Sequence, residues 1–257
     1  MPAFVILALL VAVFLTATLS GVFGMAGGII LMGVFTALMP VPVAMVTHGS
    51  VQLISNGFRA ILHRAHIQWR IIGTYFIGSV SAMALLFTVH YAPSKAWVYL
   101  LLGFVPLLTW TPSSWMQLDA AKPPQALGAG VVVTGLNILA GGAGPLLDTF
   151  FVRTGLTRHQ IIATKAMTQT FSHFAKIFFY GAPLFAAHGQ AGLPPIWFFV
   201  CMIPLSMAGG WAGGFILDQL TDVHFKSLQR WLLTLIGIVY LITAARLFMG
   251  QSGLPGV

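Results

Sequence analysis

Four polar residues recur along one apolar stretch at spacings that place them on one face of a helix. They are His48, Gln52, Ser55 and Arg59, which fall at i, i+4, i+7 and i+11. Imidazole, carboxamide, hydroxyl and guanidinium groups form hydrogen bonds, so they suit a polar or anionic ligand. The pattern predicts a polar stripe on an otherwise hydrophobic helix.

A second stretch of the chain repeats this spacing with Lys165, Gln169, Ser172 and Lys176. Polar groups are costly to bury in a bilayer, so such stripes normally face a bundle interior or a wet cavity. We expect the two stripes to face each other and to line a substrate-binding site, with the two glutamines nearest mid-depth. The predicted lining residues of the stripes are Thr47, His48, Gln52, Thr164, Lys165 and Gln169.

A glycine-rich segment precedes each stripe: GVFGMAGG at 21–28 and GLNILAGGAGP at 135–145. Glycine lets backbone N–H groups approach a ligand, and the helix that follows presents the positive end of its dipole. An anion is the natural occupant of such a place. The other interpretation is close helix packing, because small residues are enriched where helices touch in lipid. The glycines predicted to contact substrate are Gly27, Gly28, Gly141 and Gly142.

The remaining ionisable residues of the stripes have several interpretations. Lys165 lies deep in its segment, and its expected partner is Asp148, the acidic residue inside an apolar segment. This pair is either a structural ion pair or part of a proton-coupling device. Arg59 and Lys176 are placed near helix ends and are expected to extend to the membrane interface. The candidates for coupling or gating are Asp148, Ser55, Ser172 and His173.

The histidines do not predict an enzyme or a metal centre. Ser172 and His173 are adjacent in sequence and point about 100° apart on a helix, so they cannot act as a nucleophile and its base. His63 and His66 lie beside Arg64 without a cysteine or carboxylate, a setting that disfavours a bound cation. We therefore expect a protein that is not an enzyme and that carries no metal and no cofactor.

Composition identifies the solvent around these elements. Apolar residues make up 58% of the 257 positions and charged residues only 6%, against about 25% charged in a soluble domain. So little charge cannot cover a water-facing surface. The twelve Lys and Arg are scattered singly between apolar runs, which is typical of topology-setting loops and excludes a nucleic-acid-binding face. Cys201 is the single cysteine and is expected to pack in the interior.

Glycine, proline and the few charges divide the chain into ten apolar segments. They lie near 3–20, 29–39, 43–63, 68–90, 95–112, 126–140, 145–153, 158–180, 194–217 and 227–249. The first has no basic residue before it and is expected to be a retained membrane helix.

The second five segments echo the first five in order. Ser20-Gly21 matches Thr134-Gly135, and WVYLLLG at 97–103 matches WLLTLIG at 231–237. This indicates an internal duplication. The expected organisation is a single membrane domain with one repeat over 1–115, a linker over 116–125 and a second repeat over 126–250.

The positions of the basic residues orient the two repeats. Cytoplasmic loops collect Lys and Arg, so Arg59, Arg64 and Arg70 are placed inside. The segments 29–39 and 145–153 are too short to span at about 1.5 Å per residue, and we expect each to return to its starting side or to form a broken helix. The halves then cross in opposite directions. The predicted fold is an all-α polytopic membrane protein with two inverted repeats, each a glycine-rich broken or re-entrant helix pair followed by three transmembrane helices.

The same residues resemble a known family, the TauE/SafE family of sulfite exporters and sulfonate permease-like membrane proteins. The resemblance lies in the duplicated glycine-rich tips, in AMVTHGSVQ at 44–52 and in RHQIIATKAMTQ at 158–169. Family tips often hold three consecutive glycines, whereas Ala26 and Ala140 take the first place here and Ala143 interrupts the second tip.

The resemblance implies a secondary transporter, with export as the expected direction, of small sulfur-containing oxyanions such as sulfite or organosulfonates. It implies a multi-pass protein of the bacterial inner membrane that works by alternating access around the paired glycine-rich breaks. No segment matches the ATP-binding pattern GxxxxGK[ST], so energy would come from a gradient. The expected partners are the lipid bilayer, a small anion, a coupling proton or sodium ion and a second copy in a homodimer, with no nucleic acid. An anion channel and a non-transporting membrane partner of a sulfur-metabolising complex are the alternatives.

Overall fold

The chain folds into ten α-helices and two short 3-10 helices within the residues that the structure, a computed structural model, describes: 2–23, 26–89, 91–110, 118–188, 193–219 and 222–250. The helices are α1 (Ala3–Phe23), α2 (Ala26–Leu38), α3 (Val41–Leu62), α4 (Trp69–Val89), α5 (Lys95–Phe104), α6 (Pro123–Ala140), α7 (Gly144–Phe151), α8 (Arg158–His188), α9 (Ile196–Asp218) and α10 (Asp222–Phe248). The 3-10 helices are η1 (Arg64–His66) and η2 (Val105–Trp110). The prediction of an all-α polytopic membrane protein is confirmed.

Two predicted segments differ from the helices that form. The segment 95–112 becomes an α-helix that ends at Phe104 and continues as η2, because Pro106 lacks the N–H that an α-helical turn needs. The segment 158–180 continues to His188 and passes through Pro183. As a result Lys176 lies in the middle of α8, not near its end.

The outer helices present apolar surface as membrane-spanning helices do. Within the described residues, five helical segments are long and apolar enough to cross a bilayer: Ala3–Phe23, Trp69–Val89, Pro123–Ala140, Ile196–Ile216 and Leu228–Phe248. Exposed tryptophans lie near both ends of the bundle, with Trp97 and Trp197 at one end and Trp69 and Trp110 at the other. Tryptophan is enriched at both interfaces of a membrane, so this placement fits a spanning bundle.

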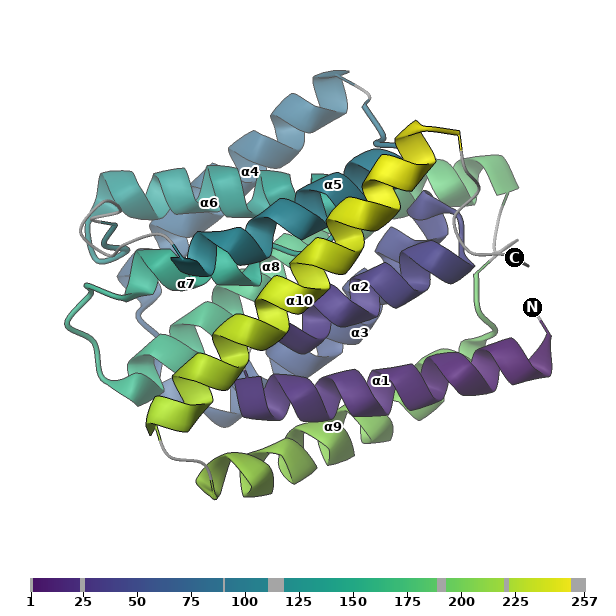
Figure 1. Ribbon diagram of the computed structural model, residues 1–257. Helices are drawn as coiled ribbons and strands as arrows, with labels where there is room; N and C mark the ends of the chain where they lie inside the picture. The colour runs from purple at the N-terminus through teal and green to yellow at the C-terminus, as the bar shows by residue number, and fades with distance from the viewer. Residues whose placement is uncertain are drawn as a thin grey trace.

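The glycine-rich segments turn the chain back on itself. Figure 1 shows α1 and α2 running in opposite directions, and α6 and α7 doing the same. A side chain at Gly27 in α2 would overlap the carbonyl oxygen of Thr16 in α1, so the two helices are in close contact. Ala120, before α6, donates its N–H to the carbonyl oxygen of Phe150 at the end of α7, at 2.8 Å. Each pair is therefore a helical hairpin, and described residues beside each turn, among them Gly27 and Gly141, are buried.

Because both hairpins return, the basic residues gather at one end. The ends of α3, α7 and α9 lie together on the left of Figure 1, and the first residues of α1 and the last of α10 lie on the right. The left end carries Arg64, Arg70, Lys122, Arg153 and Arg158. The right end carries Lys95 and Arg246. The inverted duplication itself stays a prediction.

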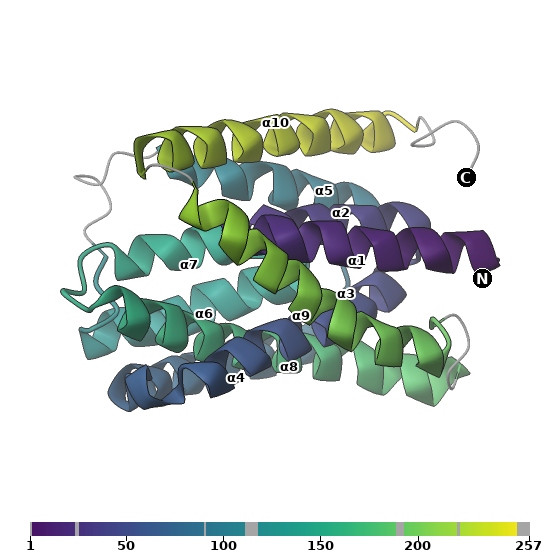
Figure 2. The ribbon, with the colours of Figure 1, turned by 90° about the horizontal axis from the view of Figure 1, so that it is seen from below.

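The hairpins and the polar helices occupy the interior. In Figure 2, α10 and α5 lie along one face and α4 along the opposite face, with α2, α3 and α7 between them. Prolines at the first turns of α3, α6 and α7 fix where these helices begin, since proline needs no backbone partner there. Gly141 ends α6 with φ +84°, the left-handed conformation that glycine adopts readily.

Candidate substrate-binding site

The two polar stripes meet along the antiparallel contact of α3 and α8. A Cβ atom at Gly49 would lie 2.7 Å from Cγ1 of Ile177, which shows how close the helices are. At the other end of α8, Thr164 Oγ1 accepts a hydrogen bond from the N–H of Gln68 at 3.0 Å, beyond the end of α3. This arrangement brings Gln52 and Gln169 to one cavity, as their spacing predicts.

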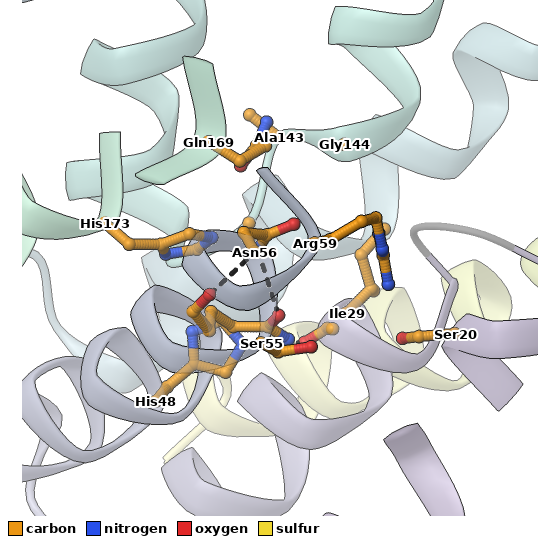
Figure 3. A pocket seen from close by; sticks show the side chains of 13 residues that line it. Ser20, Ile29, His48, Ser55, Asn56, Arg59, Ala143, Gly144, Gln169 and His173 are labelled. Atoms are coloured by element: carbon orange, nitrogen blue, oxygen red, sulfur yellow. Dashed lines mark hydrogen bonds between the residues drawn. The ribbon is translucent and has the colours of Figure 1, made fainter. Parts of the chain in front are cut away.

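The cavity has a volume of about 40 Å³ and lies where both glycine tips meet α3 and α8. Figure 3 shows α3 side chains between Gln169 and His173 of α8 and, on the other side, Ser20 of α1 and Ile29 of α2. Its lining residues are Ser20, Gly28, Ile29, His48, Gln52, Ser55, Asn56, Arg59, Gly142, Ala143, Gly144, Gln169 and His173. This volume suits an ion of a few atoms.

Two helices begin at the cavity wall. Gly28 and Ile29 belong to the first turn of α2, and Gly144 is the first residue of α7. Ala143, the residue before α7, has no side-chain group that could cap the helix. The positive ends of two helix dipoles, and the uncapped first turn of α7, therefore lie at the same cavity, which favours an anion.

The side chains of the wall offer hydrogen-bond donors and one permanent positive charge. Gln169 Nε2 and His173 Nδ1 have no hydrogen-bond partner within the described chain, although the two residues are only 3% and 4% exposed. Arg59 supplies a guanidinium, and no Asp or Glu is among the lining residues described. A buried polar group without a partner is costly, so these groups are suited to receive a ligand.

A vestibule of about 470 Å³ adjoins the cavity and shares Ser20, Ser55 and Arg59 with it. It reaches Leu62 and His63, at the end of the bundle that carries most of the basic residues. Partial burial and the neighbouring His159 lower the pKa of His63, so its imidazole is neutral at pH 7. The positive charge on the path into the cavity is therefore that of Arg59.

Several predicted lining residues lie outside the cavity wall. Lys165 forms an ion pair with Asp148 and joins α8 to α7. Ser172 is 2.7 Å from the hydroxyl of Tyr75 and 2.9 Å from that of Thr134, in a buried cluster between α4, α6 and α8. The other predicted residues away from the wall are Gly27, Thr47, Gly141 and Thr164. Gly28, His48, Gln52, Gly142 and Gln169 line the cavity with Ser55 and His173, and their roles in binding stay predictions.

The expectation that Lys176 extends to the membrane interface is wrong. Lys176 is 0% exposed, because α8 continues three more turns beyond it. Its Nζ donates to the carbonyl oxygen of Gly141 at 2.9 Å and is 2.7 Å from Nδ1 of His48. Arg59, for which the same expectation was made, faces the cavity and the vestibule.

Some lining residues carried a sequence signal that the stripes alone did not use. Asn56 occupies the position that the repeat aligns with His173, and both line the cavity. Ala143 and Gly144 follow directly on the predicted Gly142. Ser20 aligns with Thr134 in the repeat, yet only Ser20 reaches the cavity. The repeat alignment alone identifies Asn56 as a lining candidate, whereas Ser20 can be identified only from the geometry of the hairpin.

Gly27 is required for the closure of the first hairpin, so its role is close packing. We expect Gly27→Ala to lower the free energy of unfolding by about 1–3 kcal/mol, because the added Cβ would overlap Thr16 and push α2 from α1. Thermal unfolding of the purified protein in detergent measures this. Gly128→Ala is the control: no atom lies within 4 Å of a Cβ there, and alanine should stabilise α6 slightly. Equal melting temperatures for the two variants would contradict the packing role.

A helical bundle with an apolar exterior, two helical hairpins and a cationic cavity at their tips defines a polytopic membrane protein with a buried polar site. The family model described as sulfite exporter TauE/SafE matches residues 9–241 of the chain. The chain therefore belongs to the TauE/SafE family, a family of membrane transporters. Comparisons with curated proteins and with solved structures find no match.

Proposed function

We propose that this protein is a secondary transporter of small sulfur-containing oxyanions across the bacterial inner membrane, and that the anion binds in the cavity at the two hairpin tips. The observation that carries the proposal is the meeting of two helix N-termini and one guanidinium in a cavity whose described lining residues include no carboxylate. Oxyanions with three or four oxygens accept many hydrogen bonds, which N–H, amide and hydroxyl donors supply.

The vestibule supports loading from the cytoplasm. It connects the cavity to the end with most of the arginines, which is the cytoplasmic end by the rule that inner loops are positive. Export by alternating access then needs a rearrangement that closes the vestibule and opens the opposite end. The paired hairpins and the antiparallel α3 and α8 are the elements that would move.

Flux into proteoliposomes tests the proposal. Sulfite, sulfate, thiosulfate, methanesulfonate and acetate are offered in parallel to the purified protein, with protein-free liposomes as the control. We expect saturable movement of at least one sulfur oxyanion and little movement of acetate, which has one oxygen fewer than the smallest oxyanion offered. Non-saturable flux would instead indicate an anion channel. Folded protein that moves none of these anions would indicate the non-transporting partner.

A further inference from the structure

The hairpin tips are tied together by a chain of hydrogen bonds through Lys176 and His48. Lys176 Nζ donates to the carbonyl oxygen of Gly141 in the second tip. It also lies 2.7 Å from His48 Nδ1, and His48 Nε2 lies 2.9 Å from the carbonyl oxygen of Gly28 in the first tip. A carbonyl accepts only, so Nε2 carries a proton and donates it to Gly28.

This pattern is compatible with two protonation states of the pair, one charged and one neutral. With Nε2 protonated, either Lys176 is an ammonium that donates to neutral His48, or His48 is an imidazolium whose Nδ1–H is donated to a neutral amine. Both forms contain the same number of protons and one positive charge. Loss of that proton leaves a neutral amine beside a neutral imidazole, which is a second stable state. The pair therefore binds or releases one proton as a unit.

Within the part of the chain that the structure describes, no acidic residue is paired with this charge. Lys176 and His48 are 0% and 1% exposed, and their hydrogen-bond partners in the described chain are each other and two carbonyls. An unpaired charge at this depth is expensive, so the protonated pair needs an anion nearby. His48 lies in the cavity wall, between the cavity and Lys176. The anion that occupies the cavity can supply this missing charge.

The other charged and titratable groups around the pair do not provide it. His173 of α8 lies 5.6 Å from His48 between ring centroids and is another base. Arg59 is three helical turns away on α3, about 16 Å along the axis, and adds positive charge. Asp148 of α7 is paired with Lys165. The tyrosines on neighbouring elements donate their hydroxyls to carbonyls or are hydrogen-bonded to Ser172: Tyr75, Tyr99, Tyr180 and Tyr240.

We propose that Lys176 and His48 form the proton-binding site that couples proton movement to anion movement in the same direction. Anion binding stabilises the protonated pair, and by linkage protonation raises anion affinity by the same factor. The proton enters from water in the vestibule by way of His48 and leaves when the anion leaves. This inference rests on the proposed anion transport.

A pH gradient across proteoliposomes tests the coupling. The probe is methanesulfonate, which stays a monoanion over the working range, and the membrane potential is clamped at zero. Symport of one proton with one monoanion supports about tenfold accumulation for a gradient of one pH unit. We expect this accumulation from the unaltered protein and none from Lys176→Met, whose apolar chain fits the buried position. Lys95→Met, at the opposite end of the bundle from the vestibule, is the charge-matched control and should accumulate the anion normally.

Three results overturn the proposal. The unaltered protein could equilibrate methanesulfonate without any response to the pH gradient. This result would confirm anion transport but contradict the proposed proton-binding site. Undiminished accumulation of methanesulfonate by the Lys176→Met protein would show that the coupling proton binds at another site. If Lys176→Met moves no anion, calorimetry of methanesulfonate binding to the unaltered protein, in two buffers of different ionisation enthalpy, decides. Uptake of about one proton per anion supports the site, and no uptake overturns it.

Discussion

Replacing Arg59 by methionine is expected to reduce anion flux about 100-fold or more. Arg59 supplies the permanent charge on the path from the vestibule to the cavity, and no acidic partner is paired with it among the described residues. Removing one partner of a buried charge pair costs about 2–5 kcal/mol, and 1.4 kcal/mol is a factor of ten in affinity. Initial rates over a range of anion concentrations in proteoliposomes measure the loss.

The control for Arg59 is Arg64, which lies exposed at the same end of the bundle and is hydrogen-bonded to the carbonyl oxygen of Ile61. Arg64→Met removes the same charge from outside the cavity and should leave the flux within about twofold, because exposed charges are screened. Arg59→Lys should recover part of the loss, since lysine keeps the charge without the planar fork. Flux through Arg59→Met equal to that through Arg64→Met would remove Arg59 from the binding site.

The sequence predicts most of the fold because the lipid bilayer restricts the kinds of secondary structure that the chain can form. A bilayer requires apolar helices of limited length, so glycine, proline and charge mark nearly every boundary. Two helices differ from the predicted segments for local reasons. Pro106 converts an α-helical turn into η2, whereas Pro183 lies within α8, whose helix continues past it. Helical periodicity contains no information about whether neighbouring helices can hold a proline-containing turn together.

The candidate site is only partly predictable, since a stripe identifies the face of a helix but not its neighbours. All four residues of the α3 stripe reach the cavity. Of the α8 stripe, Gln169 alone does so. Tyr75 and Thr134 hold Ser172 in another cluster, and Asp148 holds Lys165. The contacts that divide the second stripe come from α4, α6 and α7. No spacing within α8 could reveal them.

The unequal stripes indicate how the protein could change state. The sequence aligns Arg59 with Lys176, yet Arg59 faces the vestibule and Lys176 is locked between His48 and Gly141. If the halves are inverted repeats, exchanging these two environments would close the vestibule and open the other end. Under the alternating access that we propose, these two aligned residues would mark the open and the closed side of the transport cycle.

Gln169 provides the clearest separation of binding from folding. We expect Gln169→Leu to abolish measurable anion transport while the melting temperature stays the same or rises. Nε2 of Gln169 is buried without a partner, so leucine of similar size removes a costly group as well as a donor to the anion. Gln52→Leu should also abolish transport, and it should lower the melting temperature slightly because Gln52 Oε1 accepts from Asn56 at 3.4 Å.

Gln68→Leu is the matched control, because its side chain donates to the carbonyl oxygen of His66 outside the cavity. Its flux and its melting temperature should both stay close to those of the unaltered protein. If the Gln169→Leu protein is stable but does not transport, the Gln169 side chain serves anion binding and lowers the stability of the folded protein. Full transport by both Gln52→Leu and Gln169→Leu would instead show that the anion crosses the membrane along another path, because these two amides line one cavity from α3 and from α8.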